Sequence, residues 1–431
     1  MMIKRFQQRS AVDRRTFLRG ATLGGAALIG GPVVALAQAQ QDPLDLLLNE
    51  IQGGDFGQGF DAASRKAVGK GTLPTLSAQT VEATEQAIPQ YEAIVGRGGW
   101  PTVAPAKSMR LGARNPSVVA LRQRLAASGD LDVTSGIGEV YDSYVDAAVR
   151  RFQARHGIGV DGTLNQQTIN ALNVPAPARL NQLKTNLVRL RSMSGNGAPR
   201  SVVCNIPAAQ IEAIENGVVV SRHTAVVGKP DRPSPDLQSR IVEINFNPYW
   251  TVPVSIVRKD LIPKMQAEPD YLTKNRIRIL DGRGEELAPA KINWYSEEAV
   301  NYKFKQDPGD LNSLGSIRIN FPSSHGVYMH DTPYKNLFGD DFRFHSSGCM
   351  RVQNVRDLVN WVLADQPGWS RPEIEHVIKS GERKDARIAK PVPLYWIYVS
   401  AWADHDGVVQ FRDDIYARDG LGQVAAAPAR G

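Results

Sequence analysis

One short segment, "FHSSGCMRVQN" at residues 344–354, places a cysteine among the small residues that a reactive sulfur needs. Cys349 follows Gly348, and the chain has one other cysteine, Cys204. A cysteine nucleophile requires a base that takes its proton and donors that stabilise an oxyanion. Glycine permits a sharp turn and a close approach of a substrate carbonyl to the backbone. The amides of Gly348 and Cys349 are therefore candidate oxyanion donors.

Three of the seven histidines lie in the segment just before this cysteine, at positions His325, His330 and His345. His330 ends the strand-like run "GVYMH" and precedes the turn "DTP", a position that holds a side chain rigidly yet leaves it accessible. His345 lies four residues before Cys349, and spacing alone does not choose between these two as the base. A zinc site fits poorly, because His325 and His330 are five apart in a strand-like run and face opposite sides.

The N-terminus has the pattern of an export signal. Arg14 and Arg15 precede a stretch from Gly20 to Gln41 without a charged residue, which ends in the small-residue motif "ALAQA". This pattern predicts a twin-arginine signal peptide over residues 1–39 and a periplasmic protein. The alternative is a retained membrane anchor, which the glycines and the proline of this stretch disfavour.

Export determines how charge and cysteines are interpreted. Residues 1–39 hold six Lys/Arg and one Asp, so they carry +5 of the formal +7. The mature chain is nearly neutral, and its basic pI does not indicate a nucleic-acid partner. Disulfides persist outside the cytoplasm, so a bridge between Cys204 and Cys349 stays possible in principle. We favour two free thiols, with Cys204 a small buried residue in the strand "VVCNI".

The chain before residue 201 is expected to be helical. About 390 mature residues predict two to three domains. Residues 40–105 form an N-terminal region with a helix at 77–97. Residues 106–176 contain "AVRRFQARHGIGVDGTLNQQTINAL", which resembles the peptidoglycan-binding domain of the first type; a three-helix spacer without a ligand is the alternative. Residues 177–200 form a linking helix with leucines at spacings of three and four.

Residues 201–420 are expected to form a strand-rich domain. The run "SVVCNIPAAQIEAIENGVVVSRHTAVVG" alternates and has Asn-Gly as a hairpin turn. Residues 255–300 interrupt the strands with a helical pattern, so we expect an insertion there. The segment "PLYWIYVSAWADHDGVVQFRDDIY" is expected to be a closing hairpin, and residues 421–431 a disordered tail.

The segment "HDTPYKNLFGDDFRFHSSGCMRV" resembles the catalytic signature of L,D-transpeptidases. Its histidine lies nineteen residues before its cysteine. "VVGKPDRPSP", "NPYWTVP" and "DHDGVVQFRDDIYARDG" are similar to the large, lid-bearing subfamily, and the resemblance covers about residues 40–420. It implies an α+β multidomain protein: a mixed β-sandwich catalytic domain with a helical lid insertion, and a small three-helix peptidoglycan-binding domain.

The resemblance also implies roles for individual residues. Cys349 is the nucleophile and His330 the proton acceptor and donor, while the Gly348 and Cys349 amides form the oxyanion hole. Arg351 orients the loop or the substrate. Ser347 stands where many members have histidine, as is usual in the lid-bearing subfamily.

The remaining residues around the expected site have weaker assignments. Tyr328 and Trp250 are expected to shape the cleft together with the lid, although many of the aromatic residues belong to the core. His325 is rejected as the base because it lies too far before Cys349, and His345 is expected to be a polar group of the loop.

The implied reaction is acyl transfer between peptidoglycan stem peptides. The sulfur attacks the bond between an L-centre and the terminal D-residue of a donor tetrapeptide, and an acceptor amine resolves the thioester. No metal or organic cofactor is needed, and the partners are stem peptides and glycan. The motif does not separate 3-3 from 1-3 cross-links, or cross-linking from anchoring of an outer-membrane protein. A non-catalytic wall-binding protein is the alternative from another class.

Overall fold

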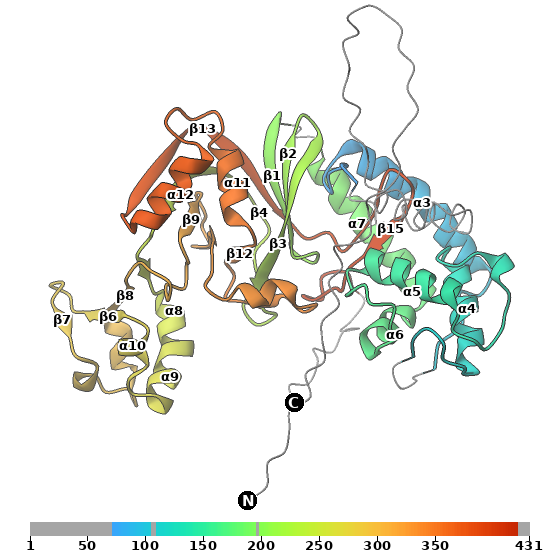
Figure 1. The fold of residues 1–431 in the computed structure, drawn as a ribbon, viewed down its shortest axis with the longest axis horizontal. Coiled ribbons are helices and arrows are strands. Elements are labelled where there is room, and N and C mark those ends of the chain that lie inside the picture. Colours follow the sequence, from blue (N-terminus) through green and yellow to red (C-terminus); the bar gives the residue numbers. More distant parts are fainter. Residues whose placement is uncertain (1–70, 105–108, 195–197, 421–431) are drawn as a thin grey trace, which may run out of the picture. The chain divides into compact units, whose positions relative to one another are not determined.

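The computed structural model describes residues 71–104, 109–194 and 198–420 (Figure 1). The expected signal peptide at 1–39, the start of the N-terminal region and the tail at 421–431 lie outside the described residues, so these remain predictions. Among the helices that are described, none has the length and apolar character needed to cross a membrane.

Two long helices form the first layer. Helix α3 (Ala78–Gly96) begins where the Ser77 hydroxyl accepts the amide of Thr80, which caps the first turn. Helix α7 (Ala176–Met193) packs against α3 and against β14 (Ala401–Ala403). The expected helix at 77–97 thus agrees with α3 to within one residue at each end, whereas the linking helix ends seven residues before position 200.

The module between these helices contains three α-helices, as the sequence predicts. They are α4 (Ser117–Ala127), α5 (Ser143–His156) and α6 (Gln166–Leu172), with a 3-10 turn at Val133–Ser135. Asp142 caps the start of α5, and Gly157 ends it in the left-handed conformation that favours glycine. The buried faces of the three helices share one apolar core.

The strand-rich part is built on a mixed sheet of nine strands in the order β11-β3-β12-β10-β9-β4-β13-β1-β2. Strand β2 also pairs with β3, so eight of the strands close into a ring and β11 adds to β3. The strands are β1 (Arg200–Asn205), β2 (Gln210–Glu215), β3 (Val218–Gly228), β4 (Leu237–Phe246), β9 (Ile317–Asn320), β10 (Met329–His330), β11 (Phe344–Ser346), β12 (Met350–Val352) and β13 (Lys384–Ile397).

One expected element is confirmed only in part. The segment predicted as a closing hairpin is divided, because its first residues belong to β13 and pair with β1 and β4 inside the main sheet. Only β14 and β15 (Val409–Phe411) form the hairpin around Asp406-Gly407. Buried apolar residues such as Trp396 explain the difference, since they give this segment a place in the centre of the sheet.

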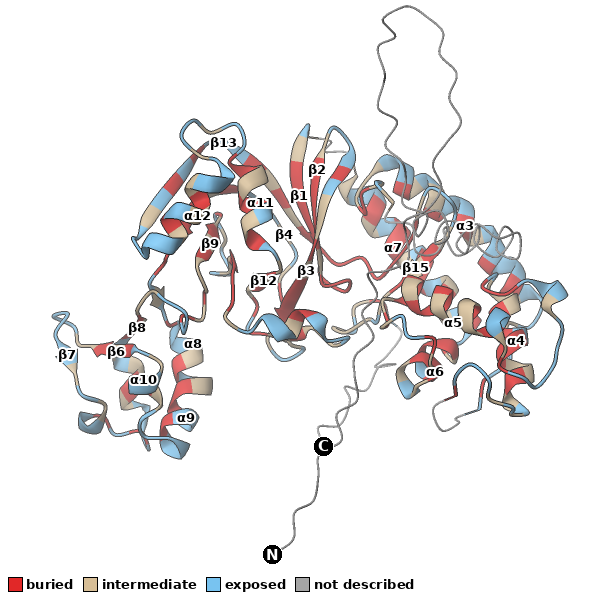
Figure 2. Ribbon diagram, in the orientation of Figure 1, coloured by how far each residue is buried: buried red, intermediate tan, exposed pale blue. Residues whose placement is uncertain are grey.

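Two helices cover the sheet and define its buried face. Helices α11 (Val355–Val362) and α12 (Arg371–Ser380) bring Leu358 and Ile374 into one apolar cluster with Met329 and Met350 of the sheet. Figure 2 shows the buried residues concentrated on the strands and on the inner faces of these helices. Side chains that alternate with Met329 and Met350 must point away from this core.

The insertion has its own core. Its first half is helical, as expected, with α8 (Val254–Ile256), the π-helix η2 (Val257–Leu261), α9 (Ile262–Ala267) and α10 (Tyr271–Lys274). It also contains a four-stranded sheet that the sequence did not indicate, made of β5 (Trp250–Thr251), β6 (Ile277–Leu280), β7 (Glu286–Leu287) and β8 (Lys303–Gln306). Residues from Val252 to Phe304 build its separate apolar cluster. We call this insertion the lid.

Candidate active site

The register of two short strands brings the candidate nucleophile and base together. Strand β10 pairs in parallel with β12, with Met329 opposite Met350 and His330 opposite Arg351. Paired residues on neighbouring strands point to the same face. Because the two methionines enter the core, His330 and Arg351 point to the opposite face. Cys349 lies next to Met350 in sequence and therefore falls on the side of the sheet that carries His330.

Tyr328 contacts the sulfur and links it to the lid. Its backbone N–H and its hydroxyl both hydrogen-bond the thiol of Cys349. The indole Nε1 of Trp250 donates to the Tyr328 hydroxyl at 3.2 Å. The ring of Tyr328 meets that of His330 edge-on, with 5.6 Å between ring centroids. The structure thus brings together four of the residues that the sequence singled out.

The environment of Cys349 keeps the thiol protonated. Burial raises the pKa of the thiol to about 11, although hydrogen bonds from Tyr328 and the positive charges of Arg318 and Arg351 oppose the shift. A thiol with this pKa forms very little thiolate at neutral pH. Attack on a carbonyl therefore requires a base that removes the proton during the reaction.

His330 has the properties of such a base. Its Nδ1–H donates to the carbonyl oxygen of Asp331, which fixes the tautomer and leaves Nε2 with a free lone pair. Burial lowers the pKa of the imidazole to about 3, and the nearby charges of Arg351 and Arg318 add to the effect. At neutral pH the ring is uncharged and can accept a proton at Nε2.

The turn after His330 is held by its own ion pair and hydrogen bonds. The carboxylate of Asp331 accepts from the backbone N–H of Ser316 at 3.0 Å and from its hydroxyl at 2.9 Å. Lys335 forms an ion pair with the same carboxylate. These contacts fix the backbone carbonyl that orients the imidazole.

The loop before the nucleophile differs from the sequence expectation. Gly348 has a φ of +109°, which only glycine adopts readily. Its N–H donates to the hydroxyl of Ser346 at 3.2 Å, and the Ser346 hydroxyl donates to the carbonyl of Cys349 at 2.5 Å. The Gly348 amide is therefore engaged inside the loop, unlike the free oxyanion donor that the sequence suggested. In the described part of the chain, the Cys349 amide has no hydrogen-bond partner, so it is the backbone donor that remains.

A contact between the lid and the nucleophile loop was missed by sequence reasoning. Arg232, in the turn between β3 and β4, donates to the hydroxyl of Ser347 at 3.0 Å and forms an ion pair with Asp260 of the π-helix. Ser347 itself is exposed. The Lys-Pro-Asp-Arg turn that contains Arg232 lies 117 residues before Cys349, so no local pattern pointed to this contact.

Arg318 is a second residue that the sequence did not single out. It lies on β9 directly opposite His330, and its guanidinium carbon is 4.2 Å from the ring centroid of Tyr328. The alternation in "SIRINF" was the available indication, because Ile317 and Ile319 are buried and leave Arg318 on the other face.

The other histidines and the second cysteine lie outside this cluster. His345 hydrogen-bonds the carbonyl of Phe342 at 2.8 Å, and His325 is exposed in a loop. Cys204 is fully buried in β1, and both cysteines are free. Within the described ranges, His, Cys, Asp and Glu side chains form no group of three that could hold a metal ion.

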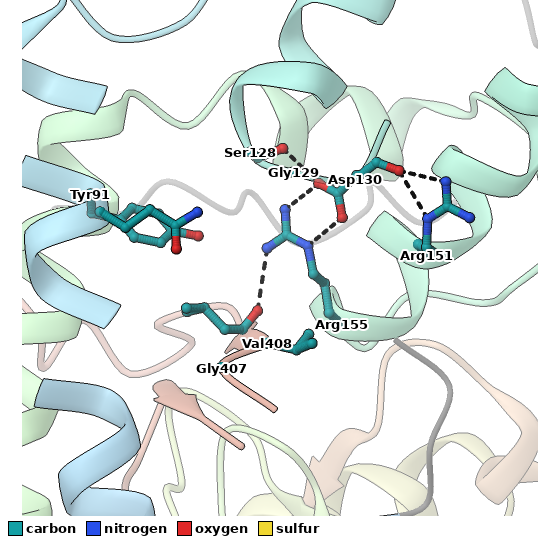
Figure 3. A pocket seen from close by; sticks show the side chains of 10 residues that line it. Tyr91, Ser128, Gly129, Asp130, Arg151, Arg155, Gly407 and Val408 are labelled. Atoms are coloured by element: carbon teal, nitrogen blue, oxygen red, sulfur yellow. Dashed lines mark hydrogen bonds and ion pairs between the residues drawn. The ribbon is translucent and has the colours of Figure 1, made fainter. Parts of the chain in front are cut away.

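A separate cavity of about 170 Å³ lies between the three-helix module, α3 and the β14–β15 hairpin (Figure 3). Arg155 binds both carboxylate oxygens of Asp130, at 2.6 and 2.5 Å, and donates to the carbonyl of Val409 at 3.3 Å. Arg151 donates twice to the backbone oxygen of Asp130. The charged groups of this cavity are satisfied by one another, so they stabilise the module against the hairpin.

Comparisons with known proteins agree with this geometry. Residues 199–379 match the model of the L,D-transpeptidase catalytic domain, and residues 114–172 match that of the "Putative peptidoglycan binding domain". Residues 199–379 are therefore similar to the L,D-transpeptidase catalytic domain, and residues 114–172 are similar to the peptidoglycan-binding domain. Both resemblances seen in the sequence, and the α+β multidomain fold, are confirmed.

The match covers only part of the relative of known sequence and differs in extent among the solved structures. A "Putative L,D-transpeptidase" of Haemophilus influenzae is 33% identical over 264 residues, which are 59% of this chain and 53% of the relative. The chain thus spans about half the length of that protein. Among solved structures, an L,D-transpeptidase from Mycobacterium smegmatis has 15% identity, a TM-score of 0.22 and coverage of 47% and 59% of the two chains. One from Xylanimonas cellulosilytica has 14% identity, a TM-score of 0.22 and coverage of 68% and 100%. Scores this low support no further conclusion.

Proposed function

We propose that this protein is a peptidoglycan L,D-transpeptidase, a cysteine-dependent acyltransferase that works in the periplasm. One observation carries the proposal. Cys349, next to Met350, and His330 lie on the same face of two paired strands, and the Nδ1–H of His330 is fixed by Asp331 so that Nε2 is the basic atom. The family of residues 199–379 gives the class of substrate.

The reaction follows from the protonation states. Nε2 of His330 takes the thiol proton as Sγ of Cys349 attacks the carbonyl carbon of the L-centre in the donor stem. The C–N bond to the terminal D-residue breaks, His330 returns the proton to the leaving amine, and a thioester remains. An acceptor amine then attacks the thioester carbon, the C–S bond breaks, and the thiol is restored.

Donors on the loop and on Tyr328 stabilise the oxyanion of each tetrahedral intermediate. The amide of Cys349 is the backbone donor, and the hydroxyl of Tyr328, which already contacts the sulfur, is the side-chain donor. Trp250 holds this hydroxyl in place from the lid side. The lid limits the access of water, which otherwise hydrolyses the thioester.

The proposal includes two classes of acceptor amine. A stem-peptide amine gives 3-3 or 1-3 cross-links, whereas an amine on an outer-membrane protein gives a wall anchor by the same chemistry. Residues 114–172 are proposed to hold the enzyme on the glycan.

The test is mass spectrometry of the intact mature protein with meropenem, which acylates a reactive active-site thiol. We expect one adduct per chain on the wild type, none on Cys349→Ala, and slow formation on His330→Ala. Incubation with muropeptides and chromatography of the products then identifies the acceptor. A free, reduced Cys349 that forms no adduct would falsify the catalytic proposal and favour a wall-binding protein.

A further inference from the structure

Two arginines beside the nucleophile lack an anionic partner. The side chains of Arg318 on β9 and Arg351 on β12 form no ion pair and no hydrogen bond with any described residue. The guanidinium of Arg318 instead lies over the ring of Tyr328. The Nε atoms of both arginines are buried and have no hydrogen-bond partner among the described residues. A buried unsatisfied donor is costly, and these two side chains are therefore available to bind an acceptor group of a ligand.

The strand register places these two cations on either side of the base. Arg318 is paired with His330 across β9 and β10, and Arg351 is paired with His330 across β10 and β12. The three side chains therefore form a row on one face, with neighbouring strands about 4.8 Å apart. A fourth member, Asn245 on β4, extends the row beyond Arg318.

Other arginines around the site have partners. Arg232 is paired with Asp260, and Arg222 is paired with Glu212. The acid that follows the base in sequence, Asp331, is occupied by Lys335 and Ser316. The positive charge on the row of Arg318 and Arg351 is thus uncompensated in the described part of the chain, and it is complementary to an anion on the substrate.

The position of the base identifies which anion this is. In the proposed reaction, His330 protonates the nitrogen of the leaving D-amino acid. One carbon atom separates this nitrogen from the terminal carboxylate, so the carboxylate must lie beside His330. We propose that Arg318 and Arg351 together bind the terminal carboxylate of the donor stem, and that they restrict the donor to peptides whose scissile bond precedes a free C-terminal D-residue. This inference rests on the proposed function.

A carboxylate bound by these two arginines would also help the base to accept a proton. Arg351 and Arg318 both lower the pKa of His330, so they oppose formation of the imidazolium. A carboxylate bound between them offsets this charge when the correct donor is present. Arg318 and Arg351 exchange no atoms in the reaction; they position the substrate and select it.

The test compares two synthetic donors that differ in one group: the tetrapeptide stem with a terminal carboxylate and the same peptide with a terminal carboxamide. Formation of the Cys349 thioester and release of D-alanine or its amide are followed by mass spectrometry and chromatography. We expect the wild type to prefer the acid in kcat/KM by roughly 10- to 100-fold, the range expected for a charge-assisted hydrogen bond. Arg318→Gln should lose most of this preference, because its kcat/KM should fall for the carboxylate donor and stay unchanged for the carboxamide donor.

Three controls separate binding of the carboxylate from damage to the fold. Arg318→Lys keeps the charge and should retain part of the preference, and Arg351→Gln should reduce it like Arg318→Gln. Arg240→Gln on β4, an exposed arginine, should behave like the wild type. Equal use of acid and amide by the wild type, or an equal loss for both donors in Arg318→Gln, overturns the inference while the proposed function stands. If the wild type forms no thioester at Cys349 with either donor, the proposed function itself is contradicted.

Discussion

The indole of Trp250, on the first strand of the lid, donates a hydrogen bond to the hydroxyl of Tyr328, which in turn contacts the sulfur of Cys349. The lid and the nucleophile are thus joined through one phenolic hydroxyl. A substitution at Trp250 should therefore change the reactivity of the Cys349 thiol.

Tyr328→Phe tests this connection. The change removes a hydroxyl that lowers the pKa of the Cys349 thiol, so the thiol pKa should rise above about 11. It also removes the side-chain donor that we propose for the oxyanion. Loss of one such donor slows acylation by roughly 100-fold or more. Rates of meropenem acylation and of iodoacetamide alkylation between pH 7 and 10 measure the two effects separately.

Trp250→Phe should also slow acylation of Cys349, by a smaller factor than Tyr328→Phe. Its indole acts only through Tyr328, and one neutral hydrogen bond is worth about 1 kcal/mol, or roughly fivefold in rate. Tyr295→Phe is the matched control, because Tyr295 is an exposed tyrosine of the lid. If Tyr328→Phe reacts like Tyr295→Phe, the hydroxyl has no part in the chemistry.

The contact of Arg232 with Asp260 and Ser347 should restrain the lid. Asp260→Asn removes the ion pair, and since half-exposed pairs contribute at most about 1 kcal/mol, opening should become roughly fivefold more frequent. Hydrogen–deuterium exchange of residues 254–267 measures this directly. Arg258→Gln, which breaks an exposed pair with Glu297 inside the lid, is the control. Unchanged exchange in Asp260→Asn would show that the lid is held elsewhere.

The low pKa of His330 predicts how stability depends on pH. Between about pH 3 and 6.5 the unfolded chain binds a proton that the folded chain excludes. Stability therefore rises with pH through this window and levels off above 6.5. At pH 5 this group costs about 2 kcal/mol relative to pH 7.

His330→Gln removes this titration. Urea unfolding at pH 5 and pH 7 should show that the wild type loses about 2 kcal/mol more than the variant on acidification. The comparison of the two proteins cancels the carboxylates that titrate in the same range. Equal losses in both would mean that His330 is not buried in its neutral form.

Much of the site was accessible from the sequence because it depends on local patterns. The strand-end position of His330 and the Ser347-Gly348-Cys349 turn are short-range features of the sequence. The roles assigned to these residues remain predictions until they are tested.

What the sequence did not reveal depends on long-range pairing. Arg318 is recognisable only when β9 is known to pair with β10, and Arg232 only when the β3–β4 turn is known to meet the lid. The engagement of the Gly348 amide depends on the rotamer of Ser346, which no spacing specifies. The lid sheet was missed because two of its strands, β5 and β7, have only two residues each.

Gly348→Ala tests whether the backbone conformation of the loop before Cys349, rather than its side-chain packing, determines stability and acylation. A Cβ at this position would meet Pro233 O and Val327 Cγ1 at 3.5 Å, which is ordinary contact, so the cost comes from the φ of +109°. We expect a loss of about 1–2 kcal/mol in unfolding free energy. Acylation should fall more than tenfold, because Cys349 is displaced. Gly326→Ala is the control, since its φ is +65° and a Cβ added there would have no described atom within 4 Å. Gly326→Ala should lower the free energy of unfolding by a similar amount and leave the rate of acylation unchanged.

The ion pair between Asp130 and Arg155 should be one of the costliest single contacts to break. Both side chains are buried, and Arg155 also donates to the Val409 carbonyl of the hairpin. Asp130→Asn leaves a buried guanidinium without its counter-ion, which costs about 3–5 kcal/mol. Urea unfolding of the full chain measures this loss, and Asp132→Asn, an exposed neighbour, should leave the midpoint unchanged. Replacing both partners, as Asp130→Asn with Arg155→Met, should recover part of the loss because no unpaired charge remains. If the double variant is less stable than Asp130→Asn alone, the hydrogen bond from Arg155 to Val409 contributes more than the charge pair.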